Sequence, residues 1–166
     1  VNVASVPKRS PFRYPGGKTW FVPTFRQWMK SKKKKPKLLI EPFAGGGIIG
    51  LTAAFESLAD KILMVELDED IAAVWTTIIH GEAEKLAKLI LNFEMNHSNV
   101  QKALGVASKS SLTRAFQTIL RNRVYHGGIM APGSGLMKNG ENGKGLASRW
   151  YANTLAKRII DIGHVR

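Results

Sequence analysis

The chain has 166 residues, enough for one globular domain, and 44% of them are hydrophobic, which is ordinary for a folded protein. No apolar stretch reaches the ~18 residues that a membrane span needs, and Val1 to Lys8 lacks the apolar core of a signal peptide, so we expect a cytoplasmic protein. The 25 basic residues against 12 acidic ones give a net charge of +13, which favours a polyanionic partner such as nucleic acid.

The residue types limit the metal chemistry that is available. There is no cysteine, which excludes disulfides and thiolate metal sites. The four histidines are widely spaced in the sequence, at positions 80, 97, 126 and 164. We therefore expect no structural metal.

The first motif, FRYPGGK at Phe12 to Lys18, combines aromatic residues with a glycine pair and a lysine. Its GGKT end could belong to a phosphate-binding loop, whose backbone cradles a nucleoside triphosphate. That loop requires a glycine where Phe12 stands, and the prolines at positions 7, 11 and 15 argue against a preceding strand. The spacing therefore rejects a nucleoside triphosphatase.

A run of four lysines, Lys32 to Lys35, follows this motif. It predicts a solvated connection before a strand, with contact to DNA as the alternative.

The stretch from Lys37 to Gly50, KLLIEPFAGGGIIG, predicts a strand, an acidic turn and a glycine-rich entry to a helix. Leu38 to Ile40 form the apolar run of a buried parallel strand. Gly45 to Gly47 allow a sharp turn in which a ligand lies against bare backbone. A second apolar run, Ile62 to Val65, leads to Glu66, where a βαβ unit places an acid against ribose hydroxyls. Two strands and an acid therefore predict a site for a nucleotide-like cofactor.

The glycine pattern alone does not identify that cofactor. Gly45, Gly47 and Gly50 match G-x-G-x-x-G, which is typical of an NAD-type oxidoreductase. A glycine-rich connection that binds no ligand is the plainest alternative. Dinucleotide sites place a pyrophosphate at the helix N-terminus, where the nearby Glu41 is unfavourable. A carboxylate at the strand end suits a positively charged ligand, and S-adenosylmethionine carries a sulfonium and an ammonium group. Glu41 therefore favours a methyl donor.

Helical periodicity predicts two helices after Glu66, from about Asp70 to Ile79 and from about Glu82 to Met95, with their apolar stripes and Trp75 in the core. A third helix, capped by Ser110 or Ser111, places Arg114 and Arg121 on its polar side. The basic, glycine-rich segment 122–150 predicts a hairpin-like region, with a disordered surface loop as the alternative. A short helix is expected over 154–162.

Taken together, FRYPGGK, EPFAGGG at Glu41 to Gly47 and VELDED at Val65 to Asp70 resemble the amino-terminal half of DNA N6-adenine methyltransferases. The resemblance runs from about Ser10 onward, and the two glycine motifs at this separation are specific. It implies an α/β, Rossmann-like methyltransferase fold that binds S-adenosylmethionine between the two motifs. The cofactor contacts that it implies are Tyr14, Gly17, Lys18, Glu41, Phe43, Ala44, Gly45, Gly47, Glu66 and, as a further candidate, Asp68.

In that family a target-recognition region follows the cofactor half, and a helix that ends in an asparagine-arginine pair leads to a hairpin that enters DNA. Asn122 and Arg123 match this pair, and Gly128 matches a glycine beyond it. Gly127 and Met130-Ala131 depart from the pattern of some members, so base-specific contacts are not transferred. The candidate DNA contacts, chiefly to phosphate, are Arg121, Arg123, His126, Lys138, Asn139, Asn142, Lys144 and Arg149.

The family's catalytic Asp-Pro-Pro-Tyr segment, which binds the amine of a flipped adenine and stacks on its ring, is absent from these 166 residues. We therefore assign no catalytic residue. Two strands are expected where a doubly wound sheet has about five or six, so the fold is expected to be incomplete in this chain. Open apolar sheet edges would then favour self-association.

We expect residues 1–107 to form the amino-terminal part of the S-adenosylmethionine-binding domain and 108–166 to form the target-recognition region. The leading hypothesis is the amino-terminal portion of a site-specific DNA adenine-N6 methyltransferase that acts on double-stranded DNA, inactive as this chain alone. The second hypothesis is a non-catalytic, basic nucleic-acid-binding module with a vestigial cofactor pocket. The third is an NAD-type oxidoreductase fragment.

Overall fold

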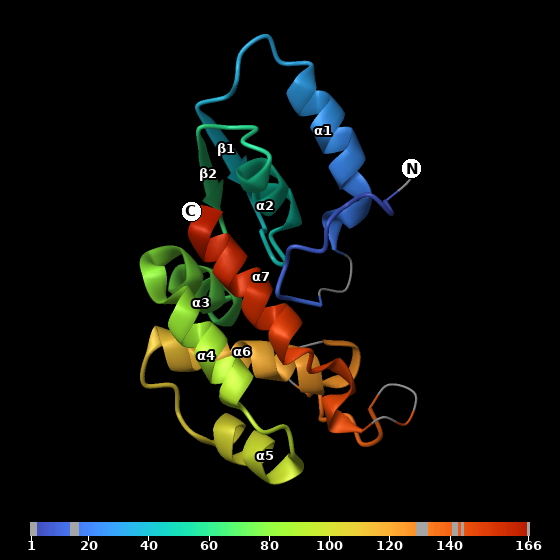
Figure 1. Ribbon diagram of the computed structural model, residues 1–166, viewed down its shortest axis with the longest axis vertical. Helices are drawn as coiled ribbons and strands as arrows, with labels where there is room; N and C mark the ends of the chain where they lie inside the picture. Colours follow the sequence, from blue (N-terminus) through green and yellow to red (C-terminus); the bar gives the residue numbers. More distant parts are fainter. Residues whose placement is uncertain (1–2, 14–16, 129–132, 141–142, 144, 166) are drawn as a thin grey trace.

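The computed structural model describes residues 3–13, 17–128, 133–140, 143 and 145–165 (Figure 1). A small parallel sheet with α1 and α2 lies at one end, and the helices α3 to α7 form the other part of the molecule. The last helix, α7, runs from the helical part back towards β2. The mixture of helices with a parallel sheet makes the chain an α/β protein.

The sheet contains two described strands, β1 (Leu38–Glu41) and β2 (Lys61–Met64), paired in parallel with Glu41 opposite Met64. They confirm the two strands predicted from the apolar runs. The helix between them, α2 (Ile48–Phe55), begins directly after Gly47. Before the sheet, a 3-10 turn at Lys18–Phe21 leads into α1 (Val22–Lys30), which has a proline in its first turn where no intrahelical donor is required.

The helical part starts with α3 (Glu69–Thr77), which continues through a π-helical turn at Ile78–Glu82 into α4 (Ala83–Asn92). The other helices there are α5 (His97–Gly105), α6 (Ser111–Val124) and α7 (Ala152–Val165). Two 3-10 turns, His126–Gly128 and Leu146–Arg149, lie within the glycine-rich segment 122–150. α3 packs against α6, and α4 packs against α7.

The structure confirms some expected helices and corrects others. Ser110 caps α6, since its hydroxyl oxygen accepts a hydrogen bond from the Thr113 amide at 3.1 Å. The helix expected from Glu82 to Met95 ends earlier, at Asn92, and a separate helix, α5, follows it. The new helix starts where Asn96 accepts from the Asn99 amide, a cap that interrupts the apolar stripe. The helix expected over 154–162 is longer at both ends.

Two hydrophobic clusters hold these elements. The smaller one packs α1 and α2 on one face of the sheet, around Phe25, Leu39 and Ile49. The larger one joins α3, α4, α6 and α7, and it includes Phe12 from the N-terminal segment. Helices on both sides of residue 107 therefore share one core.

The other face of the sheet is apolar but uncovered by the described residues. Leu38 and Ile40 on β1 and Leu63 on β2 each have about half of their surface exposed, and Val65 continues the same row at 47%. Parallel sheets are normally covered on both faces. This face is therefore the largest departure from an ordinary α/β core.

Candidate functional site

The glycine loop turns the chain sharply between β1 and α2. Phe43, Gly45 and Gly47 have positive φ angles of 54°, 51° and 63°. A Cβ on Gly47 would lie 2.5 Å from Met64 Cε and 2.9 Å from the Trp75 ring. This position therefore requires glycine both for its backbone conformation and for its packing.

Glu41, at the end of β1, connects the glycine loop with the FRYPGGK motif. It is only 4% exposed, and its carboxylate accepts a hydrogen bond from the Gly50 amide at 2.7 Å. The Lys18 ammonium lies 3.0 Å from Glu41 Oε1, an ion pair without hydrogen-bond alignment, and donates to the Phe43 carbonyl at 2.7 Å. Lys18 thus fastens the first motif to the second.

Glu66 holds the other side of the loop. One carboxylate oxygen accepts from the Gly45 amide at 2.6 Å, and the other accepts from the Asp68 amide at 3.0 Å. The Trp75 ring nitrogen, which is buried as predicted, donates to the Gly45 carbonyl at 3.0 Å. Asp68 caps α3 by accepting from the Asp70 and Ile71 amides. Both acids are therefore occupied by backbone amides, although a carboxylate has acceptor sites left for further donors.

A cavity of about 740 Å³ opens beside the loop, a volume in the range of small-molecule sites. Its lining contains six of the predicted cofactor residues, which are Gly17, Lys18, Phe43, Ala44, Gly45 and Gly47. Glu66 lines a different cavity, between β2 and α3. Glu41 and Asp68 are not among the described residues that line the cavity beside the loop. Tyr14 lies outside the described residues.

Three side chains from α6 and α7 hold the backbone of residues 10–13, where FRYPGGK begins. Asn122 accepts from the Arg13 amide and donates to the Arg13 carbonyl, both at 2.9 Å. Arg123 donates to the Pro11 carbonyl, and Arg158 donates to the Ser10 carbonyl at 3.1 Å. The Asn-Arg pair therefore positions the start of FRYPGGK, a role that the sequence did not reveal.

Gly128 allows the N-terminal segment to pack closely against α6. Asn122 also donates to the Gly128 carbonyl at 3.0 Å. Gly128 has a φ of +73°, and a Cβ there would lie 3.0 Å from the Arg13 carbonyl oxygen. A side chain would push the N-terminal segment away from α6, so glycine fits this position.

Two of the expected DNA contacts are buried. Arg123 is 4% exposed, and Arg149 is also buried and donates to the Tyr125 carbonyl at 3.1 Å. Burial, together with the neighbouring cations Arg158, Arg13 and Arg149, lowers the pKa of Arg123 to about 10. Both guanidinium groups were expected to bind phosphate, but in the fold they donate hydrogen bonds to backbone carbonyls next to the core.

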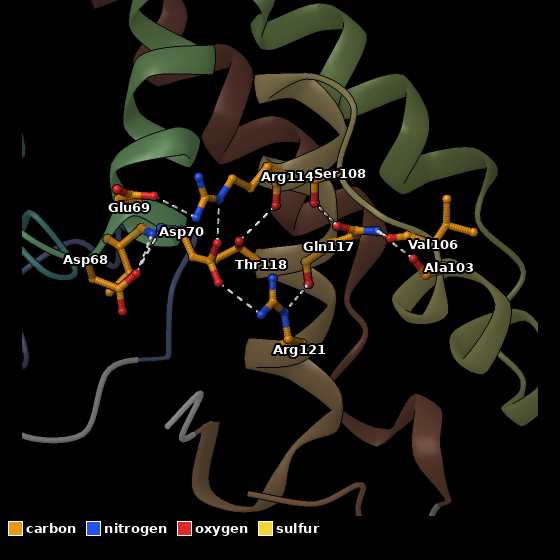
Figure 2. Close-up of polar contacts among 11 residues, drawn as sticks. Asp68, Glu69, Asp70, Ala103, Val106, Ser108, Arg114, Gln117, Thr118 and Arg121 are labelled. Atoms are coloured by element: carbon orange, nitrogen blue, oxygen red, sulfur yellow. Dashed lines mark hydrogen bonds and ion pairs between the residues drawn. The ribbon is translucent and has the colours of Figure 1, made fainter. Parts of the chain in front are cut away.

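Arg121 belongs to an ion-pair network between α3 and α6 (Figure 2). It lies 2.9 Å from Asp70, and Arg114 lies 2.6 Å from the same carboxylate and 3.0 Å from Glu69. The hydrogen bonds that Arg114 donates to Asp70 and Glu69 raise its pKa. The VELDED segment thereby contacts both the glycine loop, through Glu66, and α6.

The remaining candidates lie on the surface of the glycine-rich segment. His126, Lys138 and Asn139 are exposed. Asn142 and Lys144 lie outside the described residues. Antiparallel pairing of Tyr125 with Leu136 supports the hairpin-like character of the segment, and Leu146 is buried in the larger core.

The residues that the structure describes show neither a metal cluster nor a membrane helix. Among them no group of three or more His, Asp or Glu side chains is placed to hold a metal ion. Within the same described ranges, every helix is too short or too polar to cross a bilayer.

The fold and the site define an α/β protein with a cofactor-type glycine loop fastened to a second glycine motif. The family model of the D12 class N6 adenine-specific DNA methyltransferases matches residues 14–120. The chain belongs to this family, which confirms the resemblance inferred from the motifs. Methyltransferases of this kind generally use S-adenosylmethionine, and the family acts on DNA. No curated protein matches the chain.

Proposed function

We propose that this chain forms the S-adenosylmethionine-binding and DNA-contacting portion of a site-specific DNA adenine-N6 methyltransferase with a Rossmann-like fold. The observation that carries the proposal is Lys18, which pairs with Glu41 and donates to the Phe43 carbonyl. This contact draws FRYPGGK and EPFAGGG together around one cavity.

The polar groups around the glycine loop suit S-adenosylmethionine. The loop offers bare backbone at Gly45 to Gly47. Glu66 lines the neighbouring cavity, but it is bonded to the Gly45 amide and has acceptor sites left for ribose hydroxyls. The proposed cofactor contacts are those predicted from the motifs, with Asp68 acting mainly as the cap of α3. When bound, S-adenosylmethionine supplies the methyl group. We propose no methyl transfer by this chain alone, because it contains no Asp-Pro-Pro-Tyr segment.

For the DNA side, we propose contacts from the exposed side chains of the recognition region, which are His126, Lys138 and Asn139, with Arg121 at the edge of the α3–α6 network. The assignment of residues 1–107 to the cofactor and 108–166 to DNA is thus a division of function within a shared core.

Calorimetry with S-adenosylmethionine and with NAD tests this function. We expect the methyl donor to bind and NAD to bind more weakly or not at all. Tighter NAD binding would contradict the proposal. Binding of duplex DNA without any binding of S-adenosylmethionine would favour the alternative, a non-catalytic nucleic-acid-binding module with a vestigial pocket.

A further inference from the structure

Lysines gather at the amino-terminal end of the two-stranded sheet. One ends α1, five lie in the connection from α1 to β1, and one begins β2. The parallel pairing of the strands brings them together, because the Lys61 amide donates to the Lys37 carbonyl at 3.1 Å. All seven are exposed, and together they form the lysine patch, which consists of Lys30, Lys32, Lys33, Lys34, Lys35, Lys37 and Lys61.

Carboxylates neutralise little of the charge of this patch. Among the described residues, Lys35 is the one lysine of the patch that forms an ion pair, with Asp60 at 3.1 Å. Glu56, which follows α2, is occupied by Arg26 at 2.6 Å. Lys32 lies 4.3 Å from the centre of the Trp28 ring, a contact that leaves its charge in place. The patch therefore carries a concentrated positive charge that attracts polyanions.

The lysine patch is separate from the cofactor cavity, and none of its lysines lines that cavity. It lies at the amino ends of β1 and β2, whereas the glycine loop and Glu66 follow their carboxyl ends. A strand of four residues such as β1 separates these ends by about 13 Å. In Figure 1 the connection between α1 and β1 lies at the top of the molecule, and α6 lies in its lower half. The patch is therefore also remote from the proposed recognition region.

The chemistry of the patch favours a nucleic-acid backbone over a membrane. A helix that lies on a membrane needs a free apolar face, but the apolar side of α1, formed by Val22, Phe25 and Met29, is buried in the smaller core. Lysine binds phosphate as a point charge, without the planar fork that gives arginine its geometric specificity. A patch of lysines therefore suits the phosphates of a duplex, which carry no sequence information.

We propose that the lysine patch binds the phosphodiester backbone of duplex DNA without sequence preference, as a DNA surface additional to the recognition region. The proposal rests on the proposed function for the choice of duplex DNA as the polyanion. Phosphate contacts of this kind supply nonspecific binding and let a protein move along DNA. The patch keeps the chain on DNA while the recognition region searches, because a tethered region meets nearby sites at a high effective concentration.

The test removes four charges from the patch and, in a control, four from other surfaces. The patch variant combines Lys32→Gln, Lys33→Gln, Lys34→Gln and Lys35→Gln. The control variant has the same net charge and changes exposed positions on α4, α5 and α7, combining Lys85→Gln, Lys88→Gln, Lys102→Gln and Lys157→Gln. A third variant replaces the same four patch lysines by arginine and so keeps the charge. Thermal denaturation checks that each variant is folded.

The probe is a labelled duplex of scrambled sequence, titrated over a series of salt concentrations. We expect the patch variant to lose about tenfold or more in affinity at low salt and to lower the salt-dependence slope by about 3, because each phosphate contact contributes about 0.9. The control should stay within about threefold, and the arginine variant should recover the affinity. S-adenosylmethionine affinity, measured by calorimetry, should change in none of them, because no patch lysine lines the cofactor cavity.

A second measurement uses the unaltered protein and does not depend on the folding of a variant. Lysines are acetylated with a small reagent in the presence and in the absence of the duplex, and the modified peptides are quantified by mass spectrometry. We expect the duplex to slow the acetylation of Lys32 to Lys35 several-fold. Lys85 and Lys88, on the exposed side of α4, should react at the same rate with and without DNA.

Two further titrations identify which DNA supplies the phosphates. In the first, the duplex is lengthened from about 12 base pairs, roughly one helical turn, to about 30. A gain in affinity that the patch variant lacks would assign the patch to the flank of the duplex that the recognition region binds. In the second, two duplexes carry different fluorophores. Energy transfer that appears with the unaltered protein and not with the patch variant would assign the patch to a separate duplex.

Four results would overturn the proposal. These are an equal loss of affinity in the control variant, acetylation of Lys32 to Lys35 that the duplex does not slow, a loss of affinity with neither the length effect nor energy transfer, and patch-dependent binding to vesicles of anionic phospholipid with duplex affinity unchanged. The last result would assign the patch to a membrane surface. If the unaltered protein binds no S-adenosylmethionine but the patch effect persists, the proposed function fails and the DNA surface stands.

Discussion

Asn122 exchanges two hydrogen bonds of 2.9 Å with the backbone of Arg13, a residue 109 positions earlier in the chain. The pair joins α6 to the segment that carries FRYPGGK. Asn122 is 1% exposed, so both bonds are shielded from water. This contact makes the geometry of the cavity depend on α6 as well as on the glycine loop.

Replacing Asn122 by alanine should therefore destabilise the protein. The change removes three hydrogen bonds and leaves the Arg13 and Gly128 carbonyls short of a donor. We expect the free energy of unfolding, measured with urea, to fall by about 3 kcal/mol. Asn153→Ala, at an exposed position of α7, is the control and should change it by less than about 0.5 kcal/mol. Similar small effects in both variants would show that the contact is dispensable.

Gly47→Ala should disturb the glycine loop. The new methyl group would meet Met64 and the buried Trp75 ring at a backbone position with a φ of +63°. We expect a loss of about 2 kcal/mol or more in stability, together with weaker S-adenosylmethionine binding. Gly105→Ala has open space around it and a helical backbone, so it should be neutral. Thermal denaturation of both variants checks this, and equal midpoints would refute it.

Glu66→Ala should lower the affinity for S-adenosylmethionine. The variant releases the Gly45 and Asp68 amides and removes the acceptor proposed for the ribose hydroxyls. We expect a loss of about tenfold or more by calorimetry, since hydrogen bonds to a charged group are stronger than neutral ones. Binding of nonspecific duplex DNA should persist. Glu84→Ala, on the exposed face of α4, is the control with the same change of charge. An unchanged cofactor affinity in Glu66→Ala would remove Glu66 from the site.

Arg123 should give the stability a dependence on alkaline pH. Its pKa is about 10 in the folded protein, well below the ordinary value of an arginine, which applies in the unfolded chain. Between these values the unfolded chain binds more protons, so the contribution of Arg123 to stability rises as the pH passes through about 10. Relative to Arg123→Met, the wild type should gain stability across that range in urea denaturation.

Arg26 provides the control for this pH dependence. Its hydrogen bond to Glu56 raises its pKa, so Arg26 stays charged in both states over the same range. The difference in stability between the wild type and Arg26→Met should therefore not follow the pH. A constant difference for Arg123→Met as well would mean that its guanidinium remains fully charged in the fold.

The uncovered sheet face predicts self-association. Leu38, Ile40 and Leu63 are each about half exposed on one face of a two-stranded sheet. We expect sedimentation velocity to show oligomers that grow with concentration, because apolar surface is removed from water on association. Ile40→Lys should weaken the association. Leu89→Lys, on α4 and 41% exposed, should not. A monomer at every concentration would contradict this expectation.

The sequence revealed the parts of the fold that depend on local patterns. The strands followed from apolar runs, α6 from its periodicity and serine cap, and the glycine loop from backbone freedom that only glycine allows. The family followed from two motifs whose side chains meet through Lys18. These signals lie in short stretches, so one sequence was enough to read them.

What the sequence did not reveal depends on contacts between distant residues. Arg123 was expected to meet DNA because arginine favours phosphate, but the fold directs it to the Pro11 carbonyl and buries it. Arg158 lies in an ordinary amphipathic helix, and nothing in the local pattern marks its position on the cavity. Asp68 was a candidate ligand, although Asp before a helix is also the usual sign of a cap. For Arg123 a tertiary partner decided between two chemically sensible roles, whereas Asp68 bonds to amides at the start of its own helix.

The pinning of Ser10 to Arg13 by α6 and α7 sets the order in which the protein can mature during synthesis. The FRYPGGK motif leaves the ribosome before its partners Asn122 and Arg158, which emerge more than a hundred residues later. Until then the motif lacks these contacts, and contacts between residues far apart in the sequence form slowly. A nascent chain arrested before α6 should therefore expose the Ser10 to Lys18 region to proteases, and release of the last helix should protect it.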